Sequence, residues 1–255
     1  MKTKGIIAGA VLTLLVIGGA YIFMNMGNIA KTVSEKIGTR TLGVNVSLAS
    51  VDIDLKNKTV TAKGLEIDNP KGYSTPHSVT IDTIQIALDS FSKELLTFTN
   101  INTSGTHIYV DYKDGGLNLS DLHKGLNARA SAHKDAPEES RLAVIIKTLR
   151  IDNAMIHPSG DFANESVKQF PMPNIYMTGI GQKTNGVLVS EAIAQILGVV
   201  TQKATEASLK QGILSGLDES ALADIQSSMG ISGGLLDSIQ KETENMGSKL
   251  RGIFQ

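Results

Sequence analysis

The chain has 255 residues, of which 41% are hydrophobic, and it carries 24 Lys and Arg against 25 Asp and Glu. The net charge of −1 argues against nucleic-acid binding, which requires a basic surplus or a basic patch. The absence of cysteine excludes disulfide scaffolds, thiolate zinc sites and cysteine nucleophiles. A chain of this length can form one or two domains with a substantial core.

The N-terminal segment Gly5–Ala30 contains no charged residue. A helix rises about 1.5 Å per residue, so roughly 20 apolar residues cross a hydrocarbon layer about 30 Å thick. Lys2 and Lys4 precede the segment on a short tail, which places that tail inside. We therefore expect residues 1–30 to form a single-pass membrane anchor, with the rest of the chain on the outer side.

Two other interpretations of this segment remain open. One is a cleaved signal peptide with a small-residue cleavage site at Gly18–Ala20. The other is a core helix of a soluble protein. The apolar run continues through Tyr21–Met24, beyond the cleavage site, and this favours the anchor.

Beyond Val44 the apolar residues alternate with polar ones, which is typical of half-buried β-strands. We divide this part into a first β-rich unit at 31–127, a polar linker or mobile loop at 128–140, and a second β portion at 141–185. The alternation changes phase between Leu48 and Val51 and again at Gly64. An odd step moves the apolar side chains to the other face, so we expect a bulge or turn near Ser50 and another at Gly64.

The alternation predicts one apolar face of a sheet, and this face is the first candidate site. It is either a closed core or a surface that binds lipid, because alternation indicates a dry face without saying what covers it. Its members are Val46, Val51, Ile53, Val60, Ile67, Ile81, Ile84, Ile86, Ile108 and Val110.

After Gly186 the pattern becomes helical. Val189, Ile193, Ile196, Leu197 and Val200 recur at spacings of three and four residues, which predicts an amphipathic helix. Further glycines divide the tail, so we expect residues 186–255 to form a helical C-terminal region.

No pattern in the sequence calls for catalysis, a metal or a cofactor. The five histidines are scattered, without an H-x-x-x-H pair, and no nucleophile elbow occurs. Asp52 and Asp54 could belong to an acidic metal cluster with Asp68. However, they alternate with apolar residues, as a solvated sheet face does. We therefore expect a chain that is not an enzyme.

Several motifs carry a family resemblance. They are GVNVSLASVDIDL at Gly43–Leu55, GLEIDNPKGY at Gly64–Tyr73, IDTIQIALD at Ile81–Asp89 and GLNLSDL at Gly116–Leu122. Together with the N-terminal apolar helix, they resemble the N-terminal module of AsmA-like proteins, an envelope family of Gram-negative bacteria. The most specific piece is the turn motif formed by Asn69, Pro70, Gly72 and Tyr73. The resemblance covers roughly residues 5–200.

The resemblance implies an α+β fold with an N-terminal transmembrane helix, a curved antiparallel half-barrel or groove, and C-terminal amphipathic helices. It also implies a location in the bacterial inner membrane with the bulk of the chain in the periplasm. Its implied role is envelope maintenance, through phospholipid binding or transport along an apolar groove, and it supplies no catalytic residues. This chain is too short for a groove that crosses the periplasm. A small groove unit, an assembly partner or a regulator fits its length better.

Two alternatives to lipid handling stay open. The first is a structural or protein-interaction module in an envelope complex, which would bind protein partners rather than lipid. The second is a β-sandwich similar to late-embryogenesis-abundant-type domains, which also carry Asn-Pro after a strand.

Overall fold

The computed structural model describes residues 29–54, 56–92, 94–132, 143–161 and 168–213. These residues form a mixed α+β fold in which a curled half-barrel sheet of mostly antiparallel strands holds the long helix α4 (Val189–Lys210). The expected anchor lies outside the described residues except for its last two positions, where helix α2 (Ile29–Leu42) begins. Within the described part of the chain, no helix is both long and apolar enough to cross a membrane.

The first half of the sheet is an antiparallel meander, as the alternating pattern predicts. Its β2–β3 hairpin turns at Lys58, which has a positive φ of 52°, and its β5–β6 hairpin turns at Asp114 and Gly115. The strands are β1 (Val46–Ser47), β2 (Ser50–Asp54), β3 (Thr59–Asp68), β4 (His77–Phe91), β5 (Leu95–Lys113) and β6 (Gly116–Leu117).

A line of irregular positions crosses this meander. Gly64 in β3 and Gly105 in β5 have positive φ values of 60° and 62°, and β4 lies between these two strands. The Ala49 amide between β1 and β2 donates to the carbonyls of both Lys63 and Gly64. The strand register does not shift at Gly64 or Gly105, so no residue is inserted, and the positive φ of each glycine changes the direction of its strand. The predicted changes of face near Ser50 and at Gly64 are therefore confirmed, but they occur without an inserted residue. Their alignment across neighbouring strands accounts for the curl of the sheet.

The second half of the sheet departs from the predicted antiparallel arrangement. Strand β7 (Ala143–Ile151) and strand β8 (Met155–Gly160) both run parallel to β5. The reason is that helix α3 (Asn118–Ala132) intervenes between β6 and β7, so the chain re-enters the sheet in the direction of β5. Parallel neighbours require such a crossover connection.

The remaining short elements complete one edge of the sheet. Strand β10 (Ile175–Ile180) and strand β11 (Val187–Leu188) pair antiparallel with β7, and η2 (Gln182–Thr184) connects them. Strand β9 (Phe170–Pro171) pairs with β8.

The helices modify the predicted division of the chain. Residues 128–132, assigned above to a linker, form the end of α3, and residues 133–142 lie outside the described residues. Residues 31–40, assigned above to the first β-rich unit, belong to α2. Of the predicted helical tail, α4 is present at 189–210, whereas residues 214–255 lie outside the described residues.

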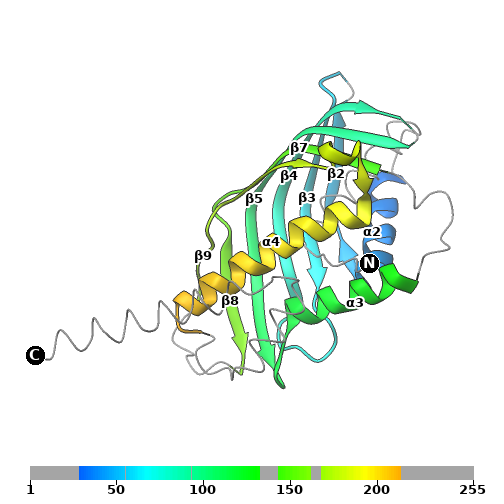
Figure 1. Cartoon of the computed structure of the whole chain (residues 1–255). Helices are drawn as coiled ribbons and strands as arrows, with labels where there is room; N and C mark the ends of the chain where they lie inside the picture. Colours follow the sequence, from blue (N-terminus) through cyan, green and yellow to red (C-terminus); the bar gives the residue numbers. More distant parts are fainter. Residues whose placement is uncertain (1–28, 55, 93, 133–142, 162–167, 214–255) are drawn as a thin grey trace, which may run out of the picture.

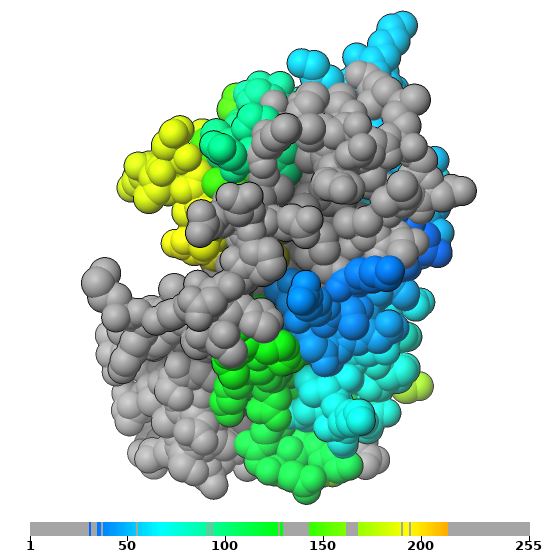
Figure 2. All heavy atoms as spheres, turned by 90° about the vertical axis from the view of Figure 1, so that its right-hand side faces the viewer, coloured from blue at the N-terminus to red at the C-terminus, as the bar shows by residue number. Residues whose placement is uncertain are grey.

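The helices lie on one side of the curled sheet, and α4 runs along it (Figure 1). Helix α4 contacts β7, β8, β10 and β11, while α2 contacts β1 and β2, and α3 contacts β5 and β6. Figure 2 shows α2 against α3 and against the strands at the start of the chain. The buried side chains of the sheet and of α4 form one hydrophobic cluster, so the core lies between these two layers.

Candidate functional site

The predicted apolar face is the inner face of the half-barrel. Eight of its ten members are buried, and the other two, Val51 and Ile53 on strand β2, are partly buried. The register explains how they meet, because Val60 pairs with Ile86 and Ile67 pairs with Val79 across β3 and β4. The face is thus a continuous apolar surface on adjacent strands.

Helix α4 belongs to the same hydrophobic cluster as this face and contacts β7, β8, β10 and β11, and its two halves differ in chemistry. Ile193, Ile196 and Leu197 in the first half are completely buried. In the second half Val200 is also buried, as is Ile213 just beyond the helix, but the buried positions between them are small or polar: Thr201, Ala204, Thr205, Ala207 and Ser208. Large aliphatic side chains each contribute about 1.5–3 kcal/mol on burial, whereas alanine and the hydroxyl residues contribute much less. Between Val200 and Ile213, the helix is therefore held to the sheet more weakly than in its first half.

The buried hydroxyls of this second half are satisfied unequally. The Ser208 hydroxyl donates to the Ala204 carbonyl at 2.8 Å, within the helix. The Thr201 hydroxyl oxygen is buried without a hydrogen-bond partner. An unsatisfied buried hydroxyl carries a desolvation cost, which further weakens the contact between the second half of α4 and the sheet.

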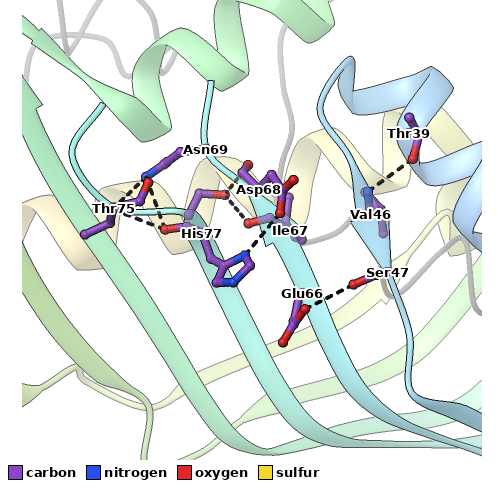
Figure 3. Close-up of polar contacts among 10 residues, drawn as sticks. Thr39, Val46, Ser47, Glu66, Ile67, Asp68, Asn69, Thr75 and His77 are labelled. Carbon is purple, nitrogen blue, oxygen red and sulfur yellow. Dashed lines mark hydrogen bonds and ion pairs between the residues drawn. The ribbon is translucent and has the colours of Figure 1, made fainter. Parts of the chain in front are cut away.

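The turn motif forms a loop at 69–76, which we call the Asn69 loop, between β3 and β4 (Figure 3). The Asn69 amide nitrogen donates to the Thr75 carbonyl, the Thr75 hydroxyl and the His77 carbonyl. The Asn69 side-chain oxygen accepts from the amide of Asn118 at 2.7 Å, at the start of α3. The same Asn118 amide also donates to the Tyr109 carbonyl of β5. These bonds fasten the loop to a strand and a helix that lie far away in the sequence.

Asp111 is the central acceptor of this network, and no motif in the sequence distinguishes it. The residue is fully buried. One carboxylate oxygen accepts from the backbone amides of Ser74 and Thr75, at 2.6 and 2.9 Å, and from both hydroxyls of these residues. The other oxygen is buried without a partner. A buried carboxylate is tolerated only when such donors surround it, so Asp111 depends on the Asn69 loop.

Tyr73 completes the loop from its other end. Its hydroxyl donates to the Asp121 carboxylate at 2.7 Å. Burial raises the pKa of Tyr73 far above its usual range, and the hydrogen bond to Asp121 and nearby carboxylates act in the same direction. The phenol therefore stays protonated, as a donor in a structural contact must. Of the remaining motif residues, Gly72 has φ +106° and its carbonyl accepts from Lys113, while Pro70 is partly buried.

The acidic residues considered for a metal cluster do not come together. Asp52 and Asp54 are exposed on β2, which confirms the solvated-face interpretation. Asp68 instead contacts His77, with 3.1 Å between its carboxylate and the imidazole Nδ1. Among the described residues, no group of three His, Cys, Asp or Glu side chains is placed to hold a metal ion.

Two of the histidines that are scattered in sequence meet in the structure. His107 of β5 and His157 of β8 lie with Nδ1 of the first 2.9 Å from Nε2 of the second. The parallel register of β5 and β8 creates this contact, because it pairs Tyr109 with His157 and places His107 one step away on the same face. No short-range spacing in the sequence indicates the pair, since 50 residues separate its members.

This histidine pair makes the stability of the fold dependent on pH. Burial, and then the charge of His107, hold the pKa of His157 below its ordinary value of 6.5. In the interval between the folded and unfolded pKa, the unfolded chain binds more protons. Acidification through this interval therefore lowers the free energy of unfolding.

We expect His157→Gln to remove this contribution. Urea denaturation at about pH 7.5 and about pH 5.5 measures it as the difference in pH dependence between the wild-type chain and the variant. The wild type should lose more stability than the variant on acidification. An equal loss in both would contradict the assignment.

A shallow depression lies between α2 and β1, with a volume of about 530 Å³. Two of its residues, Lys36 and Arg40, are exposed cations on the helix that directly follows the expected anchor. The lining residues are Glu35, Lys36, Thr39, Arg40, Asn45, Val46 and Ser47.

Comparison of the chain with models of known families, with curated proteins and with solved structures finds no match.

Proposed function

We propose that the protein is a short AsmA-like envelope protein without enzymatic activity, anchored in the bacterial inner membrane with its half-barrel in the periplasm. Its function in this proposal is to bind a phospholipid, with an acyl chain against the inner face of the sheet. The observation that carries the proposal is the continuous apolar face of the half-barrel, covered along part of its length by the weakly held second half of α4. An acyl chain is a linear apolar group that could replace a helix in such a trough.

The place of α4 determines where the lipid would enter. The C-terminal end of α4 lies beside β8 and β9 (Figure 1), and α4 contacts β8. Displacement of residues 201–210 would uncover the sheet there, while the aliphatic first half kept the helix attached. The exposed cations Lys36 and Arg40 beside the expected anchor would face anionic headgroups at the membrane surface.

A second candidate function is a protein-interaction module of an envelope complex. The observation in its favour is Tyr176, which is 64% exposed on β10, the last strand in the order of the sheet. The Arg150 guanidinium lies 5.8 Å from the centre of the Tyr176 ring. Aromatic and arginine side chains are enriched in protein interfaces, and an end strand can pair with a partner strand.

A thiol reporter on α4 tests the lipid hypothesis, because the chain has no other cysteine. Ser208→Cys is nearly isosteric and buried, whereas Gln211→Cys is an exposed control at the end of the same helix. The full-length chain in detergent is labelled with a maleimide, with and without added phosphatidylglycerol and phosphatidylethanolamine. We expect the lipids to accelerate labelling of Ser208→Cys but not of Gln211→Cys.

Mass spectrometry of the purified full-length chain provides a second readout, with co-purified phospholipid as the expected result. Unchanged labelling of Ser208→Cys together with no bound lipid would reject lipid binding. If the chain instead crosslinked to an envelope protein, and Tyr176→Ala abolished the crosslink, the interaction module would be the better description.

A further inference from the structure

The outer face of the sheet carries a compact set of donor side chains that the lipid hypothesis does not use. In β5, the side chains of His107 and Tyr109 flank buried Ile108 and so point away from the core. In β8, Met155 and His157 flank buried Ile156 in the same way. The parallel register places His107 beside Met155 and Tyr109 beside His157. Two imidazoles, a thioether and a phenol therefore form a patch two residues wide on two neighbouring strands.

The two imidazoles have well-defined positions. Each comes from the middle of a strand whose neighbouring side chain is in the core, and not from a loop. The rings lie 5.1 Å apart between centroids with an interplanar angle of 44°, and the Tyr109 ring stacks on His157 at 5.0 Å. Metal sites built on rigid elements keep their geometry better than sites on loops.

The two facing nitrogens are close enough to bind one metal ion together. When two metal–nitrogen bonds of about 2.0–2.1 Å make a right angle at the metal, the two nitrogens are about 2.9 Å apart. In a tetrahedral site the same bonds give a separation of about 3.3 Å. The separation of His107 Nδ1 and His157 Nε2 is 2.9 Å, which is an ordinary hydrogen-bond length and is short enough for one ion to bind both nitrogens after a small rotation of the rings. Tetragonal nitrogen coordination is typical of Cu²⁺ and Ni²⁺, and Cu²⁺ binds most strongly of the divalent first-row ions.

We propose that His107 and His157 form a surface site for Cu²⁺, bound through Nδ1 of the first and Nε2 of the second. In the described part of the chain, no third His, Cys, Asp or Glu joins the pair, so water would fill other positions. Met155 pairs with His107 across the two strands, and a thioether sulfur is a ligand that suits Cu⁺.

The hydrogen bond between the rings is compatible with metal entry. In this bond, one neutral imidazole donates its N–H to the free nitrogen of the other. Binding needs a lone pair on both facing nitrogens, so the donor ring must carry its proton on its other nitrogen. This is a tautomer change and releases no proton.

The test is a Cu²⁺ titration of the full-length chain in detergent, followed by electron paramagnetic resonance. We expect a first equivalent with coupling to two nitrogens. His107→Gln and His157→Gln should each weaken it at least about tenfold. His77→Gln is the matched control, because His77 is also half-buried but contacts Asp68 instead of another histidine. It should leave the first equivalent unchanged.

A measurement on the unaltered chain keeps the proposal testable even if a variant does not fold. In nuclear magnetic resonance spectra of histidine-labelled protein, substoichiometric Cu²⁺ should broaden the ring signals of His107 and His157 before those of the other three histidines. The proposal is wrong if another histidine broadens first. It is also wrong if the two-nitrogen signal survives in a folded His107→Gln/His157→Gln double variant. Neither result would bear on lipid binding, which concerns the opposite face of the sheet.

Discussion

Replacement of Asp111 by alanine should lower the free energy of unfolding by about 4 kcal/mol, because it removes a charged acceptor and leaves buried donors without partners. The donors are the backbone amides and hydroxyls of Ser74 and Thr75, all of which bond to one carboxylate oxygen. Chemical denaturation of the full-length chain measures the loss. Hydrogen exchange should also show that the amides of the Asn69 loop lose protection.

Two further variants distinguish the loss of the Asp111 hydrogen bonds from a general effect of removing a negative charge. Asp52→Ala removes an exposed carboxylate on β2 and should change stability by no more than about 0.5 kcal/mol. Asp111→Asn keeps the shape but loses the charge, so we expect a loss of about 2 kcal/mol. If Asp111→Ala were as stable as Asp52→Ala, the Asn69 loop would not depend on this carboxylate.

Ile196→Asp should be the most damaging substitution on α4, with a loss of about 4 kcal/mol or more. Its cause is an unpaired carboxylate at a position that is completely buried against the sheet. If the rest of the fold survives, the helix should leave the sheet and expose the inner face. Chemical denaturation gives the loss of stability, and an increase in binding of a fluorescent apolar dye reports the exposed face.

The neighbouring residue provides the control for this variant. Gln195 is exposed on the same turn, so Gln195→Asp introduces the same charge without burial. It should stay within about 0.5 kcal/mol of the wild type. Equal destabilisation by both variants would mean that helix propensity, and not contact with the sheet, determines the effect.

The sequence predicts the elements of this fold better than their connections. The break in alternation at Gly64 identifies the line of irregular positions in the meander, and the helical stripe beginning at Val189 identifies α4. Both patterns are local consequences of burial. The parallel pairing of β5 with β7 was not predicted, since parallel and antiparallel strands can carry the same alternation. The parallel pairing depends on the crossover through α3, and the sequences of the two strands do not indicate the length of that crossover.

The residues of the candidate site also differ in whether a local sequence pattern predicts them or only long-range contacts bring them into place. The ten apolar residues of the inner face follow from alternation, because each side chain points to a face that its own strand defines. Asp111 follows Tyr109 on the outer face and so has the pattern of a solvated residue. It is buried because the Asn69 loop, more than 30 residues earlier in the chain, folds over it. His107 and His157 become neighbours only through the register of β5 with β8.

The place of α4 at the end of the described chain has a consequence for folding. Strands β2 to β5 pair with their neighbours in sequence, so this meander needs only short loops to close and should form early. Its apolar side can be covered by α4 only after β7, β10 and β11 have added their contacts. During that interval the partly folded sheet exposes a large apolar surface. We therefore expect the rate at which α4 docks on the sheet to determine how much of the protein aggregates before it reaches the native state.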